Sequence, residues 1–134
     1  MVNIAQIGVG YWGPNLLRNL VSNSNINLTT VVDLSEERRH FVESHYPSVQ
    51  TTDNVDDILN NPDIEAVVIS TPVETHYNLA IKALNAGKHI LVEKPMATNM
   101  KDLRELKQLA KKSKTYLIAA PFVILSPTFQ AIHQ

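Results

Sequence analysis

Three glycines near the N-terminus have the spacing that a phosphate-binding turn requires. Gly8, Gly10 and Gly13 follow a short apolar run, and a helical pattern of leucines comes directly after them. The first glycine permits a tight turn, the second leaves room for a pyrophosphate against the backbone, and the third lets the helix pack closely on the strand. The N–H groups and the positive dipole at the start of that helix attract phosphate. The spacing therefore predicts a dinucleotide site, and Tyr11 and Trp12, between the glycines, are included in it.

Asp33 stands at the end of the next apolar run, twenty residues after the last of these glycines. A carboxylate there accepts hydrogen bonds from both ribose hydroxyls of an adenosine and repels a 2′-phosphate. We therefore expect NAD as the cofactor, with NADP less favoured. Two alternatives remain at this point. Asp33 could serve instead to cap the helix that starts near Ser35, and Arg38 or Arg39 could bind a phosphate and so admit NADP.

Glu93-Lys94-Pro95 follows another buried strand and supplies the predicted catalytic residue, Lys94. A lysine at that place can hydrogen-bond a substrate hydroxyl or carbonyl and stabilise negative charge that develops on the oxygen. If partial burial lowers its pKa, the same lysine can also transfer a proton. Glu93 would pair with Lys94 or accept hydrogen bonds at the nicotinamide end of the site. An ordinary ion pair in a loop explains the spacing equally well.

Strand and helix patterns alternate along the chain and place these residues at the ends of strands. Strands are expected at residues 2–7, 28–32, 49–52, 66–69, 89–92 and 116–119, and the later helices at residues 35–46, 55–59, 74–86 and 99–114. Connections of this length require parallel pairing with helices on both faces. The expected fold is a Rossmann-type, doubly wound parallel α/β sheet in three layers. Its carboxyl edge should bring Ser70-Thr71-Pro72 and Glu93-Lys94-Pro95 together with the glycines and Asp33.

The composition excludes several classes of function. A chain of 134 residues with 44% hydrophobic residues suits one domain, and a net charge of −1 disfavours a nucleic-acid or membrane surface. There is no cysteine, and the five histidines lack the spacing of metal ligands, so no metal site is predicted. Because the sequence shows neither a signal peptide nor a membrane-spanning run, a cytoplasmic location is the default expectation.

Three motifs in order resemble the glucose–fructose oxidoreductase/inositol 2-dehydrogenase (Gfo/Idh/MocA) family. They are residues 8–15, Ser70-Thr71-Pro72 with His76, and Glu93-Lys94-Pro95, and the resemblance covers nearly the whole chain. The wording Gly-Tyr-Trp-Gly-Pro-Asn is most similar to the branch that oxidises the C3 hydroxyl of a UDP-N-acetylhexosaminuronate. The resemblance implies that Lys94 is the catalytic lysine beside the nicotinamide. It also implies that Ser70, Thr71, Pro72 and His76 lie along the cofactor, with Glu93 and Pro95 beside it.

The length departs from the family pattern. Members of the family are normally more than twice as long, and their second half binds the substrate and carries an acid/base histidine four residues after an aspartate. Neither His76 nor His133 fits that description. Residues 1–120 are therefore expected to form the dinucleotide-binding domain, and residues 121–134 the start of a substrate domain. Such a chain should bind NAD but lack complete catalysis of sugar or sugar-nucleotide oxidation.

A further expectation concerns self-association. The apolar residues 117–125, with Phe129, are predicted to associate with a second copy of the chain, giving a homo-oligomer.

Two alternatives to a dehydrogenase domain remain, namely a stand-alone NAD-binding module without catalysis and a coenzyme A-binding domain. Asp33 suits ribose hydroxyls better than the 3′-phosphate of coenzyme A.

Overall fold

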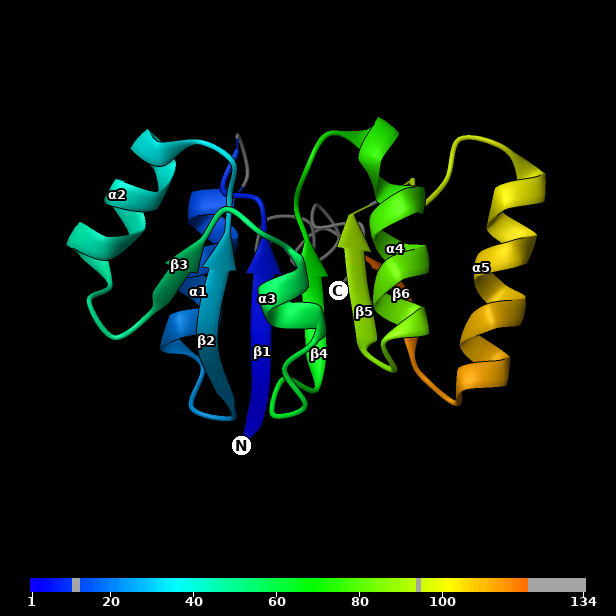
Figure 1. The fold of residues 1–134 in the computed structure, drawn as a ribbon, viewed down its shortest axis with the longest axis horizontal. Helices are drawn as coiled ribbons and strands as arrows, with labels where there is room; N and C mark the ends of the chain where they lie inside the picture. The colour runs from blue at the N-terminus through cyan, green and yellow to red at the C-terminus, as the bar shows by residue number, and fades with distance from the viewer. Residues whose placement is uncertain (11–12, 94, 121–134) are drawn as a thin grey trace, which may run out of the picture.

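A single parallel sheet organises the chain (Figure 1). The computed structural model describes residues 1–10, 13–93 and 95–120. The six strands lie in the order β3-β2-β1-β4-β5-β6, and every neighbouring pair is parallel. Their bounds are β1 Val2–Ile7, β2 Ile26–Val32, β3 Gln50–Thr52, β4 Ala66–Ile69, β5 His89–Glu93 and β6 Leu117–Ala120. The strand order reverses between β1 and β4, which confirms the predicted doubly wound Rossmann-type fold.

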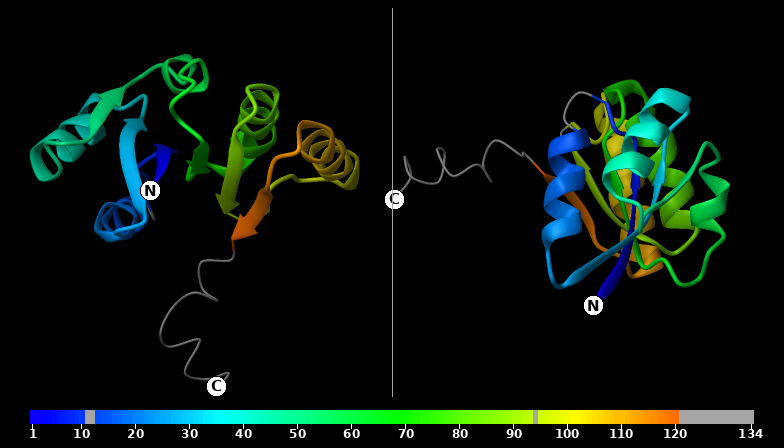
Figure 2. Two further views of the ribbon diagram at one scale, coloured as in Figure 1. Left: turned by 90° about the horizontal axis from the view of Figure 1, so that it is seen from below. Right: turned by 90° about the vertical axis from the view of Figure 1, so that its left-hand side faces the viewer.

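Helices cover both faces of this sheet. They are α1 Gly13–Ser22, α2 Glu36–His45, α3 Asp56–Leu59, α4 His76–Asn85 and α5 Met100–Ser113, and a 3-10 helix, η1 Val73–Thr75, precedes α4. Viewed along the sheet in Figure 2, α1 lies on the opposite side from α3, α4 and α5. This is the three-layer arrangement that parallel strands with helical connections require.

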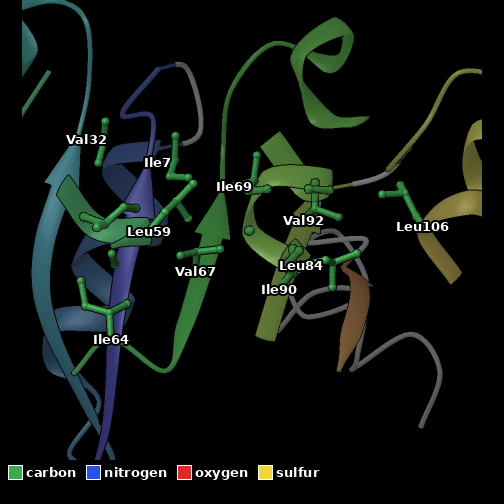
Figure 3. Close-up of a cluster of buried hydrophobic side chains, with 14 of the residues drawn as sticks. Ile7, Val32, Leu59, Ile64, Val67, Ile69, Leu84, Ile90, Val92 and Leu106 are labelled. Atoms are coloured by element: carbon green, nitrogen blue, oxygen red, sulfur yellow. The ribbon is translucent and has the colours of Figure 1, made fainter. Parts of the chain in front are cut away.

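The core consists of two clusters, one on each face. Leu17 and Leu20 of α1 and Val42 of α2 pack with Val31 on one face. The other cluster, drawn in Figure 3, joins Val32 and the inner residues of β1, β4 and β5 to α3, α4 and α5. Successive residues of a strand point to opposite faces, so neighbours such as Val31 and Val32 serve different clusters. Burial on both faces explains why the central strands read as continuous apolar runs.

The helix ends follow local signals in the sequence. The Ser35 side chain accepts a hydrogen bond from the N–H of Arg38, and Asn99 caps α5 in the same way. Gly87 follows α4 with a left-handed φ of 77°, a conformation that commonly ends a helix. The expected helix 74–86 differs at its start, where residues 73–75 form the tighter 3-10 turn. There the Thr75 hydroxyl donates to the Pro72 carbonyl oxygen at 2.6 Å.

Some predictions concern residues outside the described ranges. Tyr11, Trp12 and Lys94 are among them, and so are residues 121–134, which contain most of the predicted apolar contact surface. The proposed domain boundary near residue 120 also falls there. The described sheet ends with β6 at Ala120.

Candidate functional site

Gly8 makes the turn that brings the ends of β1, β2 and β4 together. Its φ is 93°, its N–H donates to the Val32 carbonyl oxygen at 2.7 Å, and the Ser70 N–H donates to the Ile7 carbonyl oxygen at 2.8 Å. A Cβ at Gly8 would lie 2.4 Å from the Ser70 carbonyl oxygen, closer than real Cβ atoms come. Both the backbone conformation and the close approach to β4 therefore require glycine here.

The rest of the glycine turn is held by Gln6, which the sequence analysis did not select. This fully buried side chain donates from Nε2 to the carbonyl oxygens of Gly8, at 2.9 Å, and Gly13, at 3.2 Å. A Cβ at Gly13 would lie 3.1 Å from the Gly8 carbonyl oxygen, so this glycine allows the close packing that was predicted for it. At Gly10, by contrast, the nearest described atom to an added Cβ would be an Arg38 nitrogen at 3.8 Å. Among the described residues, the space beside Gly10 is therefore less crowded than the space beside Gly8 or Gly13.

Asp33 directly follows β2 and is oriented by two backbone N–H groups. Its Oδ2 accepts from Val9 at 2.8 Å and its Oδ1 accepts from Ser35 at 2.9 Å, and the residue is 7% exposed. Each carboxylate oxygen has two acceptor positions, and among the described residues these bonds occupy one position of each. Ser35, and not Asp33, caps α2. The carboxylate is therefore fixed in place and still able to accept hydrogen bonds from a diol.

Two arginines of α2 lie near this carboxylate. Arg38 Nη1 is 4.0 Å from Asp33 Oδ2, and its side chain is 55% exposed. Arg39 donates from Nη1 to the backbone carbonyl oxygen of Asp33 at 2.8 Å. Of the two, Arg38 contributes to the lining of the cleft. Arg39 instead fastens the start of α2 to the end of β2.

These residues border a cleft of about 1050 Å³ at the carboxyl edge of the sheet. Among the predicted residues, Gly8, Gly10, Asp33, Arg38, Ser70, Thr71, Pro72 and Glu93 line it. It is large enough for a cofactor of dinucleotide size. The cleft has further walls that sequence reasoning missed, from the loop after β3 and the first turns of η1 and α4: Asp53, Asn54, Val55, Glu74, Thr75, Asn78 and Leu79. Ligands of parallel sheets bind at the carboxyl ends of the strands, and the short strand β3 ends directly before Asp53, so its position in the sequence is the signal for this loop.

His76 lies behind the cleft and does not line it. The residue is 2% exposed, its Nε2 lies 2.8 Å from the Thr71 carbonyl oxygen, and its Nδ1 lies 2.9 Å from the Pro95 carbonyl oxygen. It thus connects the loop after β4 with the loop after β5. Pro95 also stays out of the described lining and enters the site through this contact.

The described ranges, residues 1–10, 13–93 and 95–120, contain neither a candidate metal centre nor a helix that could span a membrane. Within these ranges no group of three or more histidine or acidic side chains could hold a metal ion. No helix there has the length and apolar character that crossing a membrane demands.

Comparison with a family model identifies the domain. Residues 2–120 match the model of the Gfo/Idh/MocA oxidoreductase family, described as an NAD-binding Rossmann fold. A curated relative from Comamonas testosteroni is 31% identical over 117 residues, covering 87% of this chain and 30% of the relative. That relative is a 1-carboxy-3-chloro-3,4-dihydroxycyclohexa-1,5-diene dehydrogenase. The chain spans less than half of the length of the curated relatives it matches.

Solved structures give the same fold. An NAD-binding protein from Listeria innocua is 26% identical with a TM-score of 0.81, covering 88% of this chain and 34% of that one. A biliverdin reductase from Synechocystis, in complex with biliverdin and NADP⁺, is 26% identical with a TM-score of 0.88, covering 99% and 42%. The two relatives are described with different cofactors, so the likeness does not distinguish NAD from NADP. The glycine turn, the oriented carboxylate and the family match together show that this chain belongs to the Gfo/Idh/MocA oxidoreductase family, as an NAD(P)-binding Rossmann domain.

Proposed function

We propose that this chain binds NAD in preference to NADP, as the cofactor domain of a dehydrogenase that oxidises a secondary alcohol. The carboxylate of Asp33 carries the proposal. Its two oxygens are oriented by the N–H groups of Val9 and Ser35, and among the described residues these bonds occupy one of the two acceptor positions of each oxygen. Two adjacent ribose hydroxyls are the natural donors for such a pair of oxygens. A 2′-phosphate in the same place would bring negative charge against a nearly buried carboxylate.

The charge of the cleft supports the same preference. Among the described residues that line it are four carboxylates, Asp33, Asp53, Glu74 and Glu93, and one guanidinium, that of Arg38. A phosphate monoester adds about 1.5 to 2 negative charges at neutral pH. NADP would therefore meet a more repulsive site than NAD does. The pyrophosphate common to both dinucleotides would be held by backbone N–H groups at the start of α1.

Arg38 favours NADP as the second candidate. Its exposed guanidinium lies 4.0 Å from Asp33 Oδ2 and has room to turn toward a 2′-phosphate. The residue would then compensate part of the repulsion from Asp33. Coenzyme A is a third candidate, because it also contains an adenosine diphosphate. Its 3′-phosphate would be opposed by Asp33 in the same way as the 2′-phosphate of NADP.

The proposed chemistry rests on Glu93, the last residue of β5, and on Lys94, the next residue in the sequence. Oxidation of the alcohol removes a hydride from the carbon that bears the hydroxyl group, which bound NAD would accept, and a proton from the hydroxyl oxygen, which a general base would take. Lys94 would hydrogen-bond the oxygen of that hydroxyl and stabilise the charge that develops there. The Comamonas relative is described as the dehydrogenase of a dihydroxylated ring. We therefore propose a ring alcohol as the substrate class of the whole protein, with the UDP-sugar suggested by the Gly-Tyr-Trp-Gly-Pro-Asn wording as its first candidate.

Calorimetric titration of the chain with NAD, NADP and coenzyme A tests the cofactor assignment. NAD should bind at least tenfold more tightly than either of the others, a difference of about 1.4 kcal/mol. An Asp33→Asn variant should lose affinity for NAD, while Asp63→Asn, changed in the loop before β4 and outside the cleft lining, serves as the matched control. Tighter binding of NADP than of NAD would transfer the assignment to Arg38, and tighter binding of coenzyme A would refute the dehydrogenase proposal.

A further inference from the structure

The imidazole of His76 faces two backbone carbonyl oxygens that belong to different loops. Thr71, on one side, lies in the loop after β4, and Pro95, on the other, lies in the loop after β5. Carbonyl oxygens accept hydrogen bonds and cannot donate them, so each contact requires a proton on the ring nitrogen. A neutral ring donates to one of the two loops, and a protonated ring donates to both. In either form the ring fills the space between the loops, because the residue is 2% exposed.

The two loops that meet at His76 carry one half of the cleft. Ser70, Thr71 and Pro72 line the cleft from the loop after β4, and Glu93 lines it from the end of β5. Asp33 is on the other half of the sheet, at the end of β2, where we have proposed the adenosine ribose. A dinucleotide crosses the point at which the strand order reverses. Its nicotinamide half would therefore lie over β4 and β5, next to the loops that His76 joins.

We propose that His76 is a positioning residue for the nicotinamide end of the site. By donating from Nδ1 to the Pro95 carbonyl oxygen, it would hold Pro95, and with it the end of β5 that carries Glu93, against the loop after β4. His76 is the first residue of α4, and α4 packs against both β4 and β5 in the core. The helix therefore holds the His76 ring in a fixed position between the two loops. This inference rests on the proposed dinucleotide function and adds a specific role for a residue that has no contact with the cleft.

Two substitutions separate the two contacts of the ring. The amide nitrogen of asparagine occupies about the position of Nδ1, and that of glutamine about the position of Nε2. His76→Asn therefore keeps a donor toward Pro95, and His76→Gln keeps a donor toward Thr71. The matched control is His89→Asn. His89 starts β5 at the opposite end of the sheet, and its Nδ1 accepts from the Tyr116 N–H at 2.9 Å.

The measurement compares NADH with ADP-ribose, which lacks the nicotinamide. Dissociation constants for both are determined by calorimetry, and the fluorescence of bound NADH reports on the surroundings of the nicotinamide. His76→Gln should weaken NADH by about 2- to 10-fold, as expected for one lost hydrogen bond, and change its fluorescence. Its affinity for ADP-ribose should be unchanged. His76→Asn should restore most of the NADH affinity, and His89→Asn should resemble the unchanged chain in both assays.

The possible results distinguish this inference from the proposed function. If the unchanged chain binds ADP-ribose but His76→Gln leaves the affinity and fluorescence of NADH unaltered, the positioning role is overturned and the proposed function stands. Equal losses in the Asn and Gln variants, or a parallel loss of ADP-ribose, would indicate a general structural effect and also overturn the role. If the unchanged chain binds neither ligand, the proposed function fails and the inference fails with it.

Discussion

Replacing Gly8 by alanine should destabilise this domain more than the same change at any other left-handed glycine in its described part. Gly8 and Gly87 share the feature that makes alanine costly, with φ values of 93° and 77°. Their surroundings differ completely. A Cβ at Gly8 would lie 2.4 Å from the Ser70 carbonyl oxygen and 2.7 Å from Thr71 Cγ2, whereas a Cβ at Gly87 would meet no described atom within 4 Å.

Comparing the two variants therefore separates the cost of the left-handed backbone conformation from the cost of the steric clash at Gly8. A non-glycine residue in the left-handed region costs about 1–3 kcal/mol, and Gly87→Ala should show that term alone, reduced by the lower entropy of the unfolded chain. Gly8→Ala should show the same term and, in addition, about 1–3 kcal/mol for forcing β1 and β4 apart. The Ser70 carbonyl oxygen is a backbone atom directly after β4, and the Ser70 N–H is bonded to the Ile7 carbonyl oxygen, so this oxygen cannot move aside cheaply. The total approaches the lower end of the 5–15 kcal/mol that typically stabilises a domain (about 5 kcal/mol).

Urea unfolding followed by circular dichroism measures both variants against the unchanged chain. The unfolding free energy should fall by about 1 kcal/mol for Gly87→Ala and by at least about 2 kcal/mol for Gly8→Ala. If the loss for Gly8→Ala were no larger than that for Gly87→Ala, the argument from close approach between Gly8 and Ser70 would be refuted. The requirement for glycine would then lie in the backbone conformation alone.

Three further variants test the site and its surroundings. Gly10→Ala should leave the unfolding free energy within about 0.5 kcal/mol, because the nearest described atom to the new methyl group is an Arg38 nitrogen at 3.8 Å. It should weaken NAD about tenfold or more, because the methyl group would lie where the pyrophosphate is predicted to approach the backbone, and an unchanged dissociation constant in calorimetry would contradict this. Asp33→Ala should lower the unfolding free energy by about 1–3 kcal/mol, because it leaves two backbone N–H groups without their acceptor. Asp53→Ala is the control, and equal thermal unfolding of the two variants would contradict a stabilising role for these hydrogen bonds. The hydrogen bond from Tyr77 to the Glu105 carboxylate raises the pKa of Tyr77 to about 12, so its stabilising effect is complete below pH 10 and is lost as the pH rises through 12. Glu105→Gln should return this pKa toward 10, and an ultraviolet titration in which one phenol still ionises near pH 12 would contradict the assignment.

Much of the fold could be predicted because it is encoded in local patterns. The continuous apolar run at residues 66–69 indicated a strand covered on both faces, and β4 occupies those residues at the centre of the sheet. A helix was expected to start near Ser35 and others to span residues 74–86 and 99–114, and the structure places caps at Ser35 and Asn99 and a left-handed Gly87 at these ends. Periodicity, caps and turns depend on residues close together in the chain, so they can be read from the sequence before any tertiary contact is known.

Contacts between distant segments could not be predicted in this way. Lys88 is an example outside the site, where a buried ammonium donates to the carbonyl oxygens of Asn61 and Ile64 at 2.6 and 2.7 Å, and burial lowers its pKa. In the sequence it is an ordinary surface residue between a helix and a strand. Its burial depends on how the turn before β5 packs against the loop before β4, and that packing is a property of the assembled sheet.

The sequence by itself determined the type of site, through glycines at a spacing that admits a phosphate and through a carboxylate at the end of the following strand. Only the tertiary structure decided how the site is held. It placed Val9 and Ser35 on the Asp33 carboxylate, put Gln6 beneath the glycine turn, and moved His76 from the predicted cofactor surface to a position between two loops. The physical reason is that residue type and spacing fix what a segment can bind. Which donors and acceptors meet depends on strand register and packing, which are set when the whole sheet forms.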